Sequence, residues 1–111
     1  HAKDGMSVRA FVEIAKSGEV SEVEAVFPEL KGQIDDVRER YERLVAATEN
    51  DFAAHRHRAP KKDFALAVKD RPHSAALFYL YDGKATSARA FYASRTADQL
   101  MPLLGLKADA A

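Results

Sequence analysis

The chain has 111 residues, of which 47% are hydrophobic and none is cysteine, so it is the size of one domain, is too apolar for wholesale disorder, and has neither disulfides nor thiolate ligands. Its 17 Lys/Arg equal its 17 Asp/Glu in number but not in position, because residues 1–53 hold 7 Lys/Arg against 12 Asp/Glu and residues 54–111 hold 10 against 5. The longest nearly apolar run, residues 75–81, is too short to cross a bilayer, and the lack of cysteine fits a reducing compartment, so we expect a cytoplasmic domain without a membrane partner.

Two short helices are predicted before residue 30. Residues 1–6 have the character of a cloning remnant or a linker. Ser7 can cap a helix that Gly18 ends, because a hydroxyl accepts from the first turn and glycine tolerates the left-handed turn after the last. Ser21 and Glu24 have the spacing of a capping box for a second helix, which Pro28 closes.

The next segment carries the clearest periodicity. Apolar residues and one threonine recur at spacings of three and four, the period of one helix face; they are Ile34, Val37, Tyr41, Leu44, Val45, Thr48 and Phe52. The positions between them are mostly charged. The pattern predicts a long helix from about Gln33 into the cluster at residues 55–58.

Proline and glycine punctuate the remainder of the chain. Pro60 can occupy the first turn of a helix over residues 61–69. Ser74 can cap a segment over residues 75–81, and a last helix from about Ser87 extends toward Leu100. Residues 101–111 are predicted to be a fraying tail.

One alternative stays open for residues 75–92. Residues 77–81 followed by Asp82-Gly83 also fit a strand entering a tight hairpin. The opposing strand would be the alanine-rich stretch 86–91, and no segment supplies a third strand. We therefore favour helix and predict an all-α domain over residues 7–100, with five or six helices packed compactly on one long central helix.

The basic second half predicts a polyanionic partner, because a surface of one sign concentrates ions of the other. The candidate RNA-binding residues are Arg56, Arg58, Lys61, Lys62, Lys69, Arg71, His73 and Lys84. Tyr79, Tyr81 and Tyr92 lie nearby in sequence and could stack on bases, with core packing the favoured role for Tyr79. The main alternative is a module that docks an acidic protein surface, either the first half of this chain or a separate partner.

The sequence contains no recognisable catalytic constellation. His55 and His57 are two residues apart and do not share a helix face, so they form a poor metal pair. A phosphate-binding glycine loop is also absent. A third interpretation, a small ribonuclease or toxin using His55, His57 and His73, has no support from spacing. No catalytic residue, metal or cofactor is assigned to this chain.

Two stretches resemble the C-terminal helical region of phage-type, tRNA-repairing RNA ligases. They are residues 62–69, Lys-Asp-Phe-Ala-Leu-Ala-Val-Lys, and residues 77–84, Leu-Phe-Tyr-Leu-Tyr-Asp-Gly-Lys. The upstream plan is similar, with a short helix, Pro28-Glu29 and a long charged helix containing Tyr41. The similarity covers roughly residues 7–95. The chain departs from the pattern where Phe91-Tyr92 stands in place of a tryptophan.

The resemblance implies an accessory role. In that family a separate N-terminal nucleotidyltransferase domain uses ATP and Mg²⁺ to activate and seal RNA ends, and its motifs are absent from this chain. We therefore expect a non-catalytic RNA-binding, substrate-specificity domain whose partners are RNA, tRNA among the candidates, and the nucleotidyltransferase domain of the same parent. The resemblance points to the turn at Asp82-Gly83-Lys84 and the loop from Arg71 to His73 as substrate-facing positions.

Overall fold

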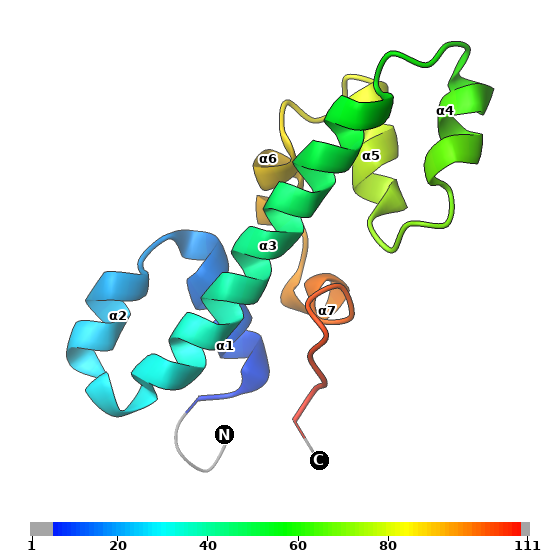
Figure 1. Cartoon of the computed structure of the whole chain (residues 1–111). Coiled ribbons are helices and arrows are strands. Elements are labelled where there is room, and N and C mark those ends of the chain that lie inside the picture. The colour runs from blue at the N-terminus through cyan, green and yellow to red at the C-terminus, as the bar shows by residue number, and fades with distance from the viewer. Residues whose placement is uncertain (1–5, 110–111) are drawn as a thin grey trace. The chain divides into compact units, whose positions relative to one another are not determined.

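The apolar stripe predicted over residues 34–52 is the buried face of one helix. In the computed structural model, which describes residues 6–109, this helix is α3 (Lys31–His55), the longest in Figure 1. Ile34, Tyr41 and Thr48 are at most 1% exposed. The prediction of a long amphipathic helix is confirmed, with a start two residues earlier than expected.

Every regular element within residues 6–109 is helical, as predicted. Six further α-helices accompany α3: α1 (Val8–Ser17), α2 (Val20–Val26), α4 (Lys61–Val68), α5 (Ser74–Tyr81), α6 (Ala88–Ala93) and α7 (Ala97–Leu100), with a short 3-10 helix η2 (Pro28–Leu30) before α3. Residues 74–81 are helical, which decides between the helix and the hairpin. None of the helices in this described part of the chain combines the length and apolar character that a bilayer span needs.

The described residues group into two compact units. Unit 1 comprises residues 6–43 and 95–109, and unit 2 comprises Leu44–Ser94. Helix α3 therefore contributes its first half to unit 1 and its second half to unit 2.

Unit 1 is built from α1, α2, η2, the first half of α3 and α7. Its buried side chains include Phe11 and Val12 from α1 and Leu100 from α7. Polar contacts join the N-terminal and C-terminal parts of this unit, since Lys16 Nζ donates to the Arg95 carbonyl at 2.7 Å. These contacts explain why sequence-distant segments share one core.

The C-terminal segment that was predicted to fray packs into unit 1. Met101 and Leu104 are buried, and Arg40 donates to the Leu104 carbonyl at 2.9 Å. Gly105, at φ 69°, reverses the chain there. Residues 1–5 of the expected remnant or linker and residues 110–111 of the expected tail lie outside the described residues.

Unit 2 is built around Phe64, Val68 and Leu77, which are fully buried on α4 and α5. Phe52, from the end of α3, contacts this cluster, with its ring centroid 6.3 Å from that of Phe64. Figure 1 shows α4 and α5 beside the last turns of α3. On α6, the Tyr92 hydroxyl meets Thr48 Oγ1 at 2.7 Å.

Two predicted helix starts are wrong and one predicted helix is divided. Ser21 does not cap α2, which begins at Val20, because Gly18 and Glu19 already complete the turn after α1 and Ser17 Oγ accepts from the Glu19 amide. Helix α5 begins at Ser74 itself, with His73 at the N-cap. The helix expected from Ser87 to Leu100 stops at Ala93 and resumes as α7.

Candidate nucleic-acid interface

The sign of the charge follows the two units. Unit 2 carries eight Lys/Arg against five Asp/Glu, whereas residues 1–43 and 95–111 carry nine against twelve. Glu49 and Asp51, which belong to the acidic half by position in the sequence, lie in the basic unit. The predicted asymmetry is therefore a property of folded units, and some acidic residues are placed where they can neutralise basic ones.

All eight candidate RNA-binding residues lie in unit 2, on α4 and the loops around it. Arg56 and Arg58 are in the α3–α4 loop, Lys61 and Lys62 in the first turn of α4, Lys69 at its C-cap, Arg71 and His73 in the α4–α5 loop, and Lys84 in the α5–α6 loop. Tyr81 Oη donates to the Arg58 carbonyl at 2.7 Å. This bond and the antiparallel run of α4 and α5 bring the α3–α4 loop to the end of α5.

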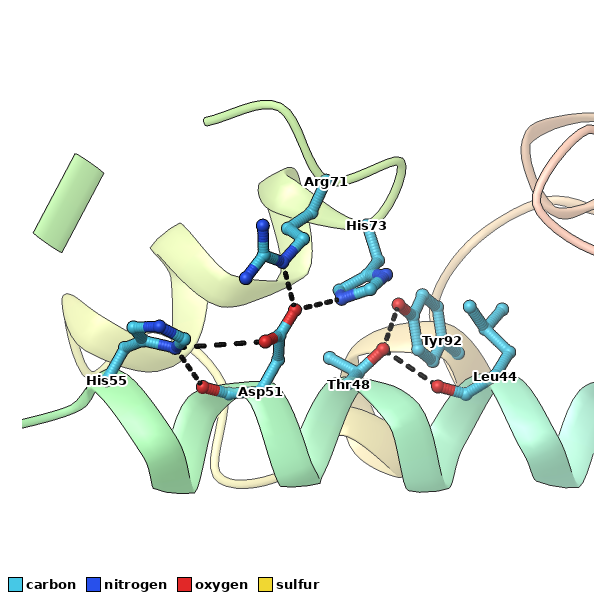
Figure 2. Close-up of polar contacts among 7 residues, drawn as sticks. All are labelled: Leu44, Thr48, Asp51, His55, Arg71, His73 and Tyr92. Atoms are coloured by element: carbon cyan, nitrogen blue, oxygen red, sulfur yellow. Dashed lines mark hydrogen bonds and ion pairs between the residues drawn. The ribbon is translucent and has the colours of Figure 1, made fainter. Parts of the chain in front are cut away.

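Two of these eight residues, Arg71 and His73, are bound by the carboxylate of Asp51 (Figure 2). Its Oδ2 accepts from Arg71 Nε at 2.8 Å and from His73 Nε2 at 2.9 Å. The Asp51 side chain is 17% exposed and that of His73 12% exposed. The carboxylate thus joins α3 to the α4–α5 loop and takes up donors that the sequence assigned to RNA.

The hydrogen-bond partners of His55 and His73 determine which ring nitrogen of each carries a hydrogen. A carboxylate only accepts, so His73 Nε2 is the donor, and His55 Nδ1 donates to the Asp51 carbonyl at 2.9 Å. Burial alone raises the pKa of Asp51, but the hydrogen bonds from Arg71 and His73 and their charges outweigh it and hold this pKa below its ordinary value. Asp51 is therefore ionised at neutral pH.

A second pairing occupies Lys61. Its Nζ lies 2.8 Å from Asp82 Oδ2 and 5.8 Å from the ring centroid of Phe78. Both partners are on or next to α5, so Lys61 holds the start of α4 against the end of α5. Its charge is compensated within unit 2.

The remaining five candidates are exposed. Within the described chain they make no ion pair with a carboxylate; they are Arg56, Arg58, Lys62, Lys69 and Lys84, and we call them the basic surface. Arg56 lies over the Phe52 ring at 5.3 Å and Lys84 over the Tyr79 ring at 5.9 Å. Exposed cations that form no ion pair are available to anions.

Of the three tyrosines near the basic residues, only Tyr79 is classed as exposed. Tyr92 is completely buried, and Tyr81 is partly buried with its hydroxyl on the Arg58 carbonyl. Tyr79 is 39% exposed, although its position in an apolar run favoured core packing. Exposure of an aromatic ring inside such a run is not visible in a sequence, because it depends on which face of α5 the rest of unit 2 covers.

The three histidines within residues 6–109 do not lie together at one point. His55 and His73 both contact Asp51, as Figure 2 shows, while His57 lies exposed in the α3–α4 loop. No group of three metal-ligating side chains occurs among residues 6–109. The arrangement orients two imidazoles around a structural carboxylate.

Comparisons with known proteins add no relative. No family model, curated protein or solved structure matches this chain.

Proposed function

We propose that unit 2 binds RNA through its basic surface, as the non-catalytic substrate-specificity domain of an ATP-dependent RNA ligase. One observation carries the proposal: five exposed cations that form no ion pair with a carboxylate of the described chain lie on one unit. They are Arg56, Arg58, Lys62, Lys69 and Lys84. Such cations bind a phosphate backbone by displacing its condensed counter-ions.

The internal pairings refine which residues contact RNA. Arg71 and His73 are engaged by Asp51, and Lys61 by Asp82. We therefore assign these three to holding the loops in place and the basic surface to phosphate contact. The resemblance to phage-type ligases in residues 62–69 and 77–84 supports the assignment to an RNA ligase, and its parent would act in the cytoplasm, with ATP and Mg²⁺ used by the nucleotidyltransferase domain.

Charge reversal tests this proposal. We expect K62E/K69E/K84E to lower the affinity for a tRNA stem-loop about tenfold or more at low salt. Each lost phosphate contact means that fewer counter-ions are released from the RNA on binding, and this release favours the complex. Lys107→Glu is the matched control, because Lys107 is exposed in unit 1. Equal affinities of the triple variant and the wild type, or binding that does not weaken with salt, would contradict the proposal.

The role in a ligase is tested in the parent enzyme. The triple variant should reduce sealing of nicked tRNA while leaving the ATP-dependent adenylation of the enzyme unchanged, because the proposed domain binds substrate and takes no part in nucleotide chemistry. Unchanged sealing would contradict the specificity role.

One observation favours the alternative of docking to an acidic protein. Leu66 is 66% exposed on α4 and lies between Lys62 and Lys69 at helical spacing, four residues after one and three before the other. An acidic amphipathic segment would match this face. Capture of such a partner that survives nuclease treatment and is lost with Leu66→Ala would favour this alternative over RNA.

A further inference from the structure

Tyr79 presents an aromatic ring at the surface of the basic unit. It is 39% exposed, and its ring centroid lies 4.9 Å from that of Phe91 at an interplanar angle of 62°. Phe91 is buried on α6, so the Tyr79 ring packs against a core residue. The ring is supported from within while part of it faces solvent.

The backbone around Tyr79 is fixed by a helix C-cap. The Lys84 amide donates to the Tyr79 carbonyl at 2.8 Å and the Gly83 amide to the Leu80 carbonyl at 3.2 Å. With Gly83 at φ 73°, these two bonds are the Schellman arrangement. The Asp82-Gly83-Lys84 turn singled out in the sequence therefore delivers the Lys84 side chain to the Tyr79 ring.

The support beneath the ring is equally fixed. Ser87 Oγ accepts from the Ala90 amide at the start of α6, and Glu49 Oε2 accepts from the Ala88 amide at 2.6 Å. Both bonds hold the first turn of α6, which carries Phe91. Preorganised aromatic rings lose little entropy when a ligand stacks on them.

We propose that Tyr79 and Lys84 bind one unpaired nucleotide of single-stranded RNA, with the base stacked on the Tyr79 ring and its phosphate bound by Lys84. This rests on the proposed RNA-binding function and names the RNA class. Bases in a duplex already stack on each other, whereas an unpaired base offers a free face to an aromatic side chain. On binding, Lys84 gives up its contact with the Tyr79 ring and contacts the phosphate instead. The contact that is lost is a cation–π interaction, which is weak at an exposed site.

The test compares RNA classes and ring variants in the full chain. A single-stranded oligonucleotide carrying 2-aminopurine and its duplex form are titrated into wild type, Tyr79→Leu and Tyr79→Phe. We expect tighter binding and quenching of 2-aminopurine with the single strand. Leucine should lower its affinity about tenfold, since a stacked base contributes a factor of this order, and phenylalanine should restore it.

Phe27→Leu is the control for the loss of an exposed ring. Phe27 is 41% exposed but lies in unit 1, so its replacement should leave both affinities unchanged. Circular dichroism melting of Tyr79→Leu establishes that the variant is folded at the assay temperature. Lys84→Gln, a change at the surface, should lower the affinity for the single strand, whereas 2-aminopurine should still be quenched in the bound state.

The outcomes separate the two proposals. Salt-sensitive RNA binding that is equal for single strand and duplex, or unchanged in both Tyr79→Leu and Lys84→Gln, overturns the nucleotide site. It leaves RNA binding by the other four residues of the basic surface intact. Absence of binding to either form overturns both proposals.

Discussion

At the scale of single residues, Asp51 decides which basic side chains are available to a ligand. The sequence placed Asp51 in the acidic half and placed Arg71 and His73 among the RNA-binding candidates. The structure brings them together across 20 and 22 residues. Charge patterning along a chain predicts where like charges gather, but it does not identify ion pairs formed through space.

Replacement of Asp51 by asparagine should destabilise the fold. Arg71 and a largely buried His73 lose the anion that accepts from both, so we expect the free energy of unfolding to fall by about 1–3 kcal/mol in urea denaturation at pH 7. Asp98→Asn is the control, because the Arg9–Asp98 pair is mostly exposed and such pairs contribute at most about 1 kcal/mol. Equal losses in the two variants would refute a special role for Asp51.

The contribution of the Asp51 carboxylate to stability should depend on pH. Because the folded state lowers the pKa of Asp51, its contribution to stability is complete above the aspartate pKa of the unfolded chain, about 3.9, and is lost as the pH falls through the lower folded value. The difference in unfolding free energy between wild type and Asp51→Asn should therefore shrink below about pH 4. Urea titrations over this range measure it, and a difference that persists unchanged in acid would show that the charge of Asp51 is not its cause.

At the scale of elements, the sequence predicted helices well where the local signals were strong. Ser7 caps α1 as expected, α6 starts next to Ser87 as predicted, and the stripe from Ile34 to Thr48 is buried. The break between α6 and α7 was missed although it has a sequence signature. Thr96 and Gln99 form a complete capping box, the Thr-x-x-Gln spacing that marks a new helix start.

The start of α5 shows what local signals cannot supply. Ser74 is a good N-cap residue, yet the helix begins with it and His73 takes the N-cap position. The His73 side chain is bound to Asp51. A contact with another helix therefore fixes this boundary.

The ends of α4 allow stability and binding to be separated. Lys61 and Lys62 occupy its first turn, where the helix dipole favours anions. Lys62→Glu should therefore raise the free energy of unfolding by about 0.3–1 kcal/mol while lowering RNA affinity, and Lys69→Glu, at the C-cap, should lower stability by a similar amount. Denaturation curves and RNA titrations of both variants measure this. Parallel losses of stability and affinity in Lys62→Glu would contradict the expectation.

At the scale of the whole molecule, the charge asymmetry was predictable and its boundary was not. The sequence divides near residue 53, whereas the units divide at Arg43 and again at Arg95. The second boundary arises because residues 95–109 pack with the N-terminal helices, through contacts such as Arg9–Asp98. Counting charges along the chain cannot reveal this return of the C-terminus.

The salt dependence of RNA affinity should report the number of available cations. Five phosphate contacts from the basic surface predict a slope of log affinity against log salt of about −3.5 on single strands, whereas the seven Lys/Arg among the eight candidates would give about −4.9. Titrations between 50 and 300 mM salt measure this slope. In Asp51→Asn the slope should become steeper if Arg71 is released to contact phosphate. A wild-type slope near the larger value would contradict the internal pairings.

The different surroundings of the four tyrosines have a practical consequence. Tyr41 and Tyr92 are buried, Tyr81 is partly buried, and Tyr79 is 39% exposed. A reagent that nitrates accessible phenols should therefore react first at Tyr79. Peptide mapping after such treatment would mark this one side chain without any mutation, and protection by an added oligonucleotide would locate the ligand on the native protein.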